Sequence, residues 1–355
     1  MEYGAIDLHK HESQVRIVTV GGEIVDRRIA TTRDRLTAIF GGRPHMRILV
    51  EASTESEWVA QHLEGLGHEV IVADTNYMPM YGHRSRQVKT DRRDVAALTE
   101  ACRLGIYRPA HRRSAARCEL QWRLTVREQI VRSRTRSITL LRTAARTAGM
   151  RVRTGGAETF LGRLEQVALP PAIHEATAPL RDTIEMLNDQ LVKADEYLSK
   201  LPDSDPVVRR LMTLPGIGPV TAVAFIAALD DVARFRGPGQ VSSYLGLVPR
   251  EYSSGEQQRR GGVVRAAHPR VQALLVQAAW RVWRSTHADT RALREWARAI
   301  GHRRGRRVAI VALARRLARV LFAMWRDGRD FEPARIRRHQ TRATSAETAP
   351  EAVTA

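Results

Sequence analysis

The sequence predicts an α/β domain over about its first hundred residues, followed by a helical region with unusually long helices. Two patterns support this. Short apolar segments alternate with amphipathic ones up to residue 104, which is typical of strands alternating with helices. Beyond residue 113 apolar residues recur at helical spacing in long stretches. Hydrophobic residues make up 43% of the 355 residues, enough to bury a sizeable core.

The N-terminal elements follow in a recognisable order. Gly21-Gly22 marks a hairpin turn between two of the strands, and Gly67 ends a helix. The predicted elements, in order, are strands at 3–8, 14–20 and 23–30, a helix at 33–40, a strand at 47–50, a helix at 55–66, a strand at 69–73 and a helix at 91–104. This is the order of a ribonuclease-H-like fold, although other α/β folds produce parts of it.

Two long helices are expected in the middle of the chain. The stretch Ser114–Ala148 has one proline-free helical pattern. A second helix carries an apolar heptad seam, formed by Leu180, Ile184, Leu187, Leu191, Ala194 and Leu198. We interpret the pair as a protruding coiled-coil arm for dimerisation. The alternative is an ordinary helical hairpin packed into one core.

The C-terminal part reads as a compact helical domain. The segment Leu214–Pro219 lies between two helical patterns and indicates a helix-hairpin-helix turn. Gly216 and Gly218 permit the tight turn, and the following helix presents free N–H groups suited to a phosphate. Further helices are expected at 271–284 and 308–325. The predicted domains are an α/β domain (1–110), a helical arm (111–205), a helical domain (206–337) and a disordered tail (338–355).

The charge is strongly positive. Lys and Arg number 58 and Asp and Glu 38, a formal charge of +20, which favours a nucleic-acid partner or, less often, an anionic membrane. A GC-rich genome explains the preference for Arg over Lys but not the size of the excess. Cys102 and Cys118 match neither a disulfide framework nor a zinc site. Without a signal peptide or membrane-spanning run, we expect a soluble cytoplasmic protein with no membrane partner.

Clustered basic residues are candidate phosphate contacts. Seven of them lie between residues 84 and 113, before the first long helix: Arg84, Arg86, Lys89, Arg92, Arg93, Arg112 and Arg113. Those further along the chain are Arg259, Arg260 and Arg265. Each cluster also has an ordinary explanation as solvated surface. Trp280 and Trp283 lie three residues apart on a predicted helix, and we expect them in the core rather than as platforms for bases.

Four carboxylates stand out by position: Asp7 in the first strand, Glu51 at the end of the buried strand, and Asp91 and Asp94 on one helix. Spacing of three residues places the last two on one helix face. In a ribonuclease-H-like fold such groups converge, and clustered carboxylates are unfavourable unless a cation such as Mg²⁺ neutralises them. Individually, Asp91 could cap its helix and Asp94 could be a solvated residue. Glu55 and Glu57 compete for the role of Glu51.

Several segments together resemble one family. They are Ala5–Lys10, Leu49–Ala52, Lys89–Asp94, Leu214–Gly218, Tyr244–Pro249, the pair Ser254-Gly255 and Arg260–Gly262. Over roughly residues 1–330 the chain resembles the DEDD transposases of the Insertion Sequence one-hundred-ten family, which include Piv-type invertases. The resemblance implies a RuvC-like N-terminal domain, a coiled-coil segment and a C-terminal transposase domain.

The resemblance also implies a function and its residues. Asp7, Glu51, Asp91 and Asp94 match the metal-binding acids, with two Mg²⁺ ions, or Mn²⁺ as a substitute. Ser254 matches the nucleophile that becomes covalently joined to DNA. The implied partners are donor and target DNA, a structured non-coding guide (bridge) RNA, and further copies of the chain in a homodimer or homotetramer. The implied location is the nucleoid of a bacterial cytoplasm.

Ser254 is weakly supported by the residues alone. A Ser-Gly pair in the polar stretch 251–258 is most often a loop turn, and Ser253 is an adjacent rival. The chain departs from the family pattern at Ser53-Thr54, where Thr-Gly is common, and at 265–269, where a glycine is missing.

We therefore expect an RNA-guided DNA recombinase. One rival is a RuvC-like junction nuclease that uses metal-activated water. The other is a non-catalytic nucleic-acid-binding protein. Neither the target site nor the guide RNA sequence can be deduced, nor whether insertion or inversion is the outcome.

Overall fold

The computed structural model describes residues 1–82, 90–254, 257–263 and 268–335; for 251–263 it describes the backbone alone. The chain divides into two compact units, Met1–Arg113 and Ser114–Ala355. None of the helices in the described ranges combines the length and the apolar character that crossing a membrane requires. The division between an arm and a C-terminal domain inside the second unit stays a prediction.

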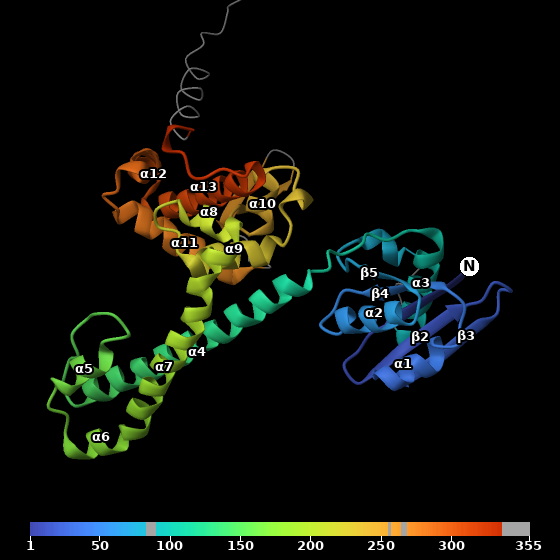
Figure 1. Cartoon of the computed structure of the whole chain (residues 1–355), viewed down its shortest axis with the longest axis horizontal. Helices are drawn as coiled ribbons and strands as arrows, with labels where there is room; N and C mark the ends of the chain where they lie inside the picture. Colours follow the sequence, from blue (N-terminus) through green and yellow to red (C-terminus); the bar gives the residue numbers. More distant parts are fainter. Residues whose placement is uncertain (83–89, 255–256, 264–267, 336–355) are drawn as a thin grey trace, which may run out of the picture. The chain divides into compact units, whose positions relative to one another are not determined.

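The first unit is built on one five-stranded mixed sheet (Figure 1). Its strand order is β3-β2-β1-β4-β5. The strands are β1 (Glu2–Asp7), β2 (Glu12–Val18), β3 (Ile24–Ala30), β4 (Met46–Glu51) and β5 (Glu69–Ala73). Strands β1, β2 and β3 form an antiparallel meander, whereas β4 and β5 run parallel to β1. The predicted α/β class of this region is confirmed.

Both faces of this sheet are covered by helices. The helices are α1 (Arg33–Phe40), α2 (Ser56–Gly65), the short 3₁₀ helix η1 (Met78–Tyr81) and α3 (Asp91–Leu104). Alternate residues of β1 face opposite sides, as strand geometry requires. Ile6 joins a buried cluster with Leu36 of α1 and Leu63 of α2. Ala5 joins the cluster that contains Leu98 of α3, so α3 covers the other face.

The second unit begins with two long helices that pack side by side in opposite directions (Figure 1). These are α4 (Ala115–Thr147) and α7 (Ala178–Ser204), joined through α5 (Phe160–Glu165) and α6 (Pro171–Ala176). Arg123 stacks on the ring of Tyr197 at 3.6 Å, and Arg134 donates to Asn188 at 2.9 Å. Residue numbers rise along α4 as they fall along α7, which defines an antiparallel hairpin.

The apolar seam of α7 is buried inside this hairpin. Leu187 and Leu191 are 9% and 7% exposed in the single chain. Ile184 belongs to a buried cluster with Ile138 and Leu141 of α4. Helix α4 of the same chain thus covers this seam, and the use of the helix pair as a dimerisation arm stays a prediction. The dimeric or tetrameric state stays a prediction.

The remaining helices form one buried core. They are α8 (Pro206–Met212), α9 (Pro219–Leu229), η2 (Val232–Arg234), α10 (Pro238–Tyr244), α11 (Pro269–Arg284), η3 (Ala288–Thr290), α12 (Arg291–Arg304) and α13 (Arg306–Asp327). Every residue from Thr221 to Leu229 is buried, so α9 is the central helix. Trp280 and Trp283 are half-buried against this core, as we expected. Helix α12 was not predicted.

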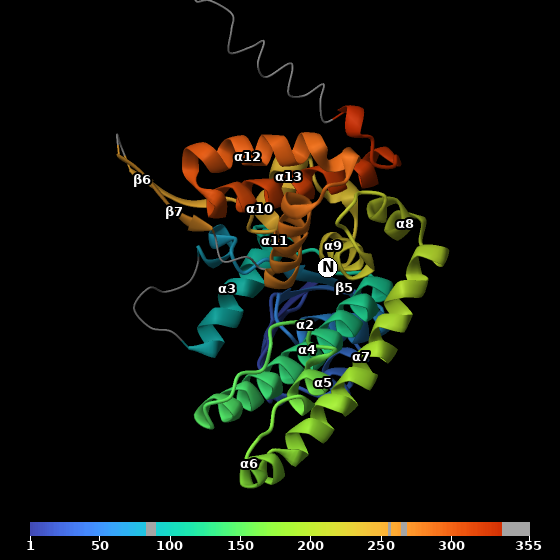
Figure 2. The same ribbon diagram turned by 90° about the vertical axis from the view of Figure 1, so that its left-hand side faces the viewer.

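A two-stranded antiparallel hairpin follows α10, visible in Figure 2. Its strands are β6 (Pro249–Ser254) and β7 (Gln257–Val263), with Ser254 opposite Gln257. We expected a polar loop at 251–258, but residues 251–254 and 257–258 belong to strands, and the two residues between them lie outside the described ranges. These residues lack the alternating apolar pattern that indicates a strand in a sequence.

Candidate active site and metal centre

Asp7 and Glu51 end neighbouring parallel strands. The β1–β4 register pairs Ile6 with Val50, so the next residues of the two strands are these two carboxylates. Asp7 lies two residues after Ala5, and Glu51 lies two residues after Leu49. Ala5 and Leu49 both belong to the cluster with α3, and side chains two apart in a strand face the same side. Both carboxylates therefore face α3.

Helix α3 brings the other two carboxylates to this place. Thr90 is its N-cap, and the Thr90 side chain accepts from the backbone N–H of Arg93. Asp91 is consequently the first helical residue, not the cap, and its carboxylate is exposed. Asp94 follows on the same face and is half-buried. Helix α3 packs on β1, β2 and β4, which fixes this face against the sheet.

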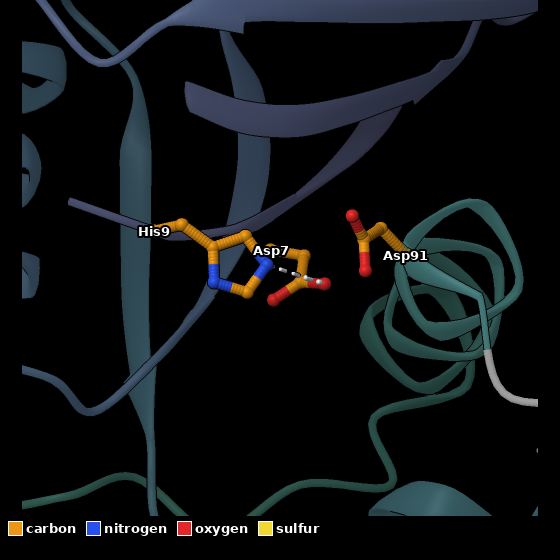
Figure 3. Close-up of side chains that lie close together, drawn as sticks. All are labelled: Asp7, His9 and Asp91. Atoms are coloured by element: carbon orange, nitrogen blue, oxygen red, sulfur yellow. Dashed lines mark ion pairs between the residues drawn. The ribbon is translucent and has the colours of Figure 1, made fainter. Parts of the chain in front are cut away.

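His9 completes a compact group of possible metal ligands. One ligand atom each from Asp7, His9 and Asp91 lies within 4.8 Å of the others (Figure 3). The Nε2 atom of His9 lies 3.6 Å from Oδ2 of Asp7, and the His9 side chain is 56% exposed. The sequence analysis quoted His9 within a segment but assigned it no role. Its position two residues after Asp7, on the same side of the chain, was the available signal.

The other three carboxylates act electrostatically on Asp7. Burial raises the pKa of Asp7, and the neighbouring charges of Glu51, Asp91 and Asp94 raise it further. His9 opposes this by lowering the pKa of Asp7. All four predicted acids are thus close enough to couple. A cation is the usual way in which proteins relieve such a concentration of like charge.

The donor set fits a hard divalent cation. Carboxylate oxygens are the ligands that Mg²⁺ and Mn²⁺ prefer, and the strand ends and α3 bring several of them together. The imidazole of His9 is a softer ligand, which suits a first-row transition metal better than Mg²⁺. The residues present therefore fit a divalent metal ion.

The two competitors of Glu51 have other partners. Glu55 accepts a hydrogen bond from the indole N–H of Trp58 at 2.6 Å. Glu57 pairs with Arg112, whose hydrogen bond lowers the pKa of Glu57. Neither contributes to the pKa of Asp7, whereas Glu51 does. Glu51 therefore stays our predicted second ligand.

Several predicted nucleic-acid contacts are engaged within the chain. Arg92 forms an ion pair with Asp26 at 3.0 Å although its side chain is 73% exposed. Arg112 bonds to both Glu57 and Glu64, and these bonds raise its pKa. Arg93 is exposed in the first turn of α3. A role in nucleic-acid binding stays a prediction for these residues and for Arg113.

The predicted glycine turn has a structural explanation of its own. Gly216 has a φ of +99°, and a Cβ there would lie 3.1 Å from Val282 of α11. A side chain is therefore excluded both by conformation and by packing. Gly218 is the N-cap of α9. The helix–turn–helix path is as predicted, and phosphate binding by this turn stays a prediction.

The structure describes only some of the remaining predicted site residues. Arg84, Arg86, Lys89 and Arg265 lie outside the described residues. Ser254 is the last residue of β6, and Arg259 and Arg260 pair through their backbones with Tyr252 and Glu251. Ser254 belongs to the second unit, whereas the four acids belong to the first. The roles of these residues stay predictions.

Two family models match most of the chain. The DEDD transposase model of the IS110 group matches residues 5–148, a range that contains all four carboxylates. The model described as transposase of the IS116/IS110/IS902 family matches residues 208–295, which contain Ser254. The chain belongs to the IS110/IS116/IS902 family of transposases. Its enzyme class is therefore that of transposases.

Two curated relatives of this transposase match it over nearly its whole length, and a third matches about two thirds of it. A probable family 20 transposase of Pseudomonas aeruginosa is 29% identical over 325 residues, covering 90% of this chain and 95% of the relative. The transposase for insertion sequence element IS1328 of Yersinia enterocolitica is 25% identical and covers 92% and 97%. The transposase for element IS1111A of Coxiella burnetii is 27% identical and covers 66% of each chain.

Proposed function

We propose that this transposase cleaves and rejoins DNA strands under the guidance of an RNA from its own element. In this proposal Asp7, Glu51, Asp91 and Asp94 hold two divalent cations, and Ser254 forms a covalent link to DNA. The observation that carries the metal site is the convergence of the neighbouring strand ends, with Asp7 and Glu51, on the first turn of α3, with Asp91 and Asp94. Bound divalent cations would polarise a phosphodiester and stabilise the charge that develops during displacement.

The residues of the proposed site would have distinct roles in this reaction. The two strand ends fix Asp7 and Glu51, and the first turn of α3 fixes Asp91 and Asp94, so the ligands are held by rigid elements rather than by loops. Placing His9 beside Asp7 adds a nitrogen ligand or a hydrogen-bond donor to a bound phosphate. The RuvC-like character of this unit is part of the proposal, supported by the order of its strands and helices.

Ser254 would supply the nucleophile. Its Oγ forms a bond to phosphorus as the strand's own P–O bond breaks, so one phosphodiester replaces another and no bond energy is lost. The hydroxyl proton leaves to solvent, and the departing strand oxygen takes up a proton. The family match around residues 208–295 supports this assignment. The partners would be donor DNA, target DNA and the guide RNA, acting with two or four copies of the chain.

A nicked DNA duplex that carries the element end tests the nucleophile. The full chain, with Mg²⁺ and RNA transcribed from the element's flank, should become attached to a strand end in a band that resists denaturation. Ser254→Ala should abolish the band while RNA and DNA binding persist, and Ser253→Ala should keep it. Cleavage by Ser254→Ala at the wild-type rate would instead identify a nuclease that uses water.

A further inference from the structure

Most of the net positive charge of the chain lies in one stretch. Residues 257–326 contain 17 arginines and only two carboxylates, Asp289 and Glu295. Residues 296–326 contain nine arginines and no carboxylate. Soluble proteins usually mix both signs of charge on their surfaces. This stretch forms most of α11, α12 and α13, which pack on one another within one unit (Figure 1).

The few carboxylates of this region are already engaged. Asp289 lies beside His287, and Glu295 pairs with Arg291. Within the described ranges, ten arginines of these helices form no ion pair with a carboxylate: Arg281, Arg284, Arg298, Arg303, Arg304, Arg306, Arg307, Arg315, Arg316 and Arg319. Eight of them are exposed, so that their charge is available to an external partner, whereas Arg315 and Arg316 are half-buried.

Five of these arginines gather where three helix ends meet, and we call them the arginine surface: Arg284, Arg303, Arg304, Arg306 and Arg307. All five are exposed. The guanidinium carbons of Arg284 and Arg306 lie 5.3 and 5.7 Å from the ring centre of Trp280. The end of α11 and the start of α13 therefore meet at this ring. Arg303 and Arg304 precede Arg306 across the single residue Gly305.

Folding does not account for this arrangement. Cations at the C-terminal end of α12 are favoured by the helix dipole, but Arg306 and Arg307 occupy the first turn of α13, where the dipole opposes them. Further along α13, burial and the neighbouring Arg319 lower the pKa of Arg316. Arg306 and Arg307 are therefore unfavourably placed in the free protein, and a bound polyanion would offset that effect.

We propose that the arginine surface binds the phosphodiester backbone of a nucleic-acid duplex without regard to base sequence. Guanidinium groups form strong charge-assisted bonds with phosphate oxygens, and several together give high affinity for a polyphosphate. The proposal rests on the proposed function only in that the chain acts on nucleic acid. It adds a surface that extends beyond residue 295, where the matched family model ends.

The aromatic residues favour a duplex over a single strand. Binding of unpaired bases relies on free aromatic faces for stacking. The guanidinium groups of Arg284 and Arg306 lie over the ring of Trp280, and that of Arg316 lies over the ring of Trp296, 4.5 Å from its centre. Both tryptophans are half-buried. The arginine surface thus presents positive charge but no free aromatic face on which a base could stack. Such a surface suits the phosphate backbone on the outside of a double helix.

The test compares variants of the full chain in EDTA, so that catalysis plays no part. The variant Arg303→Gln/Arg304→Gln/Arg307→Gln removes three exposed charges and leaves the stacked Arg284 and Arg306 in place. Arg303→Lys/Arg304→Lys/Arg307→Lys keeps the charge. Arg27→Gln/Arg35→Gln/Arg136→Gln removes three exposed charges elsewhere and is the matched control. Affinity for random-sequence 30-base-pair DNA and RNA duplexes, and for single strands, is measured between 50 and 200 mM salt.

The glutamine variant should bind every duplex sequence more weakly. The slope of log affinity against log salt should become shallower by about 2 to 3, since each phosphate contact contributes about 0.9. The lysine variant should stay near wild type. The DNA and RNA arms show which duplex the surface prefers. An unchanged slope, an equal loss in the control variant, or a loss confined to single strands would overturn the proposal. Because no cleavage is measured, these outcomes are independent of the metal site and of Ser254.

Discussion

Arg92 in the first turn of α3 donates a hydrogen bond from Nε to Oδ2 of Asp26 in β3, over 3.0 Å. Asp26 also accepts two hydrogen bonds from Arg16 of β2, and the bond from Arg16 is the main reason that its pKa is lowered. This pair ties the helix that carries Asp91 to the sheet that carries Asp7. Arg92 is thus a positioning residue for the carboxylate cluster.

Removing that tie should loosen the metal site without unfolding the unit. Because Arg92 is largely exposed, its pair contributes at most about 1 kcal/mol, so Arg92→Gln should weaken Mn²⁺ binding by up to about fivefold. Calorimetric titration measures this. Arg28→Gln breaks the exposed pair between Arg28 and Glu12 on the same two strands and should leave the affinity unchanged. Equal affinities for both variants would mean that α3 is held by packing alone.

The repulsion around Asp7 should be visible in stability. Its raised pKa means that the charged form is disfavoured in the folded state, so the neutral isostere Asp7→Asn should raise the Tm in EDTA by about 3 °C. Mg²⁺ should raise the Tm of the wild type but not of this variant, because a ligand that binds the folded state stabilises it. Glu23→Gln, an exposed change in the same unit, is the control. A lower Tm for Asp7→Asn in EDTA would contradict the clustering of charge.

Removal of the His9 imidazole should weaken the binding of Mn²⁺ more than the binding of Mg²⁺. If its imidazole is a ligand, His9→Asn should weaken Mn²⁺ binding by about tenfold and Mg²⁺ binding less, because nitrogen ligands suit transition metals. His11, also exposed and two residues further on, provides the matched change His11→Asn. Should both variants bind Mn²⁺ like the wild type, His9 is not a ligand.

Lowering the pH should reduce the stability of the first unit, partly because Glu57 becomes protonated. The pKa of this carboxyl is lowered below its usual 4.5, chiefly by the hydrogen bond from Arg112. The pair therefore contributes stability above about pH 4.5 and loses it as the pH falls through the lowered pKa. Urea unfolding at pH 6 and pH 3 should show a smaller difference for Glu57→Gln than for the wild type, by about 1 kcal/mol or less. An identical difference would show that the pair adds no net stability.

Much of the first unit could be predicted from the sequence, because its strands and helices alternate regularly. The helices at 33–40 and 91–104 have the predicted bounds, since apolar spacing and the caps at Thr32 and Thr90 mark their starts. The four carboxylates could be found because strand ends and a helix turn place them predictably. His9 could not be assigned from one strand's pattern, since its role depends on Asp91 across the sheet edge.

The second unit shows where such reasoning fails. The heptad seam of α7 was recognised, but a sequence does not say whether α4 of the same chain or another copy covers it. Helix α12 was missed because its sequence, rich in arginine, has only a narrow apolar stripe, including Leu293 and Ala297. The strands at 249–263 were missed because their residues are mostly polar.

The central claim is that the carboxylates converging on α3 hold the metal that cleaves DNA. Glu51→Gln and Glu55→Gln, assayed for Mg²⁺-dependent strand cleavage on the element-end duplex, test it most directly, because they make the same chemical change four residues apart. Glu51→Gln should lose at least about 100-fold in cleavage rate, while RNA and DNA binding persist. Glu55→Gln should cleave near the wild-type rate, since Glu55 bonds to Trp58 instead. Full cleavage by Glu51→Gln would contradict the account.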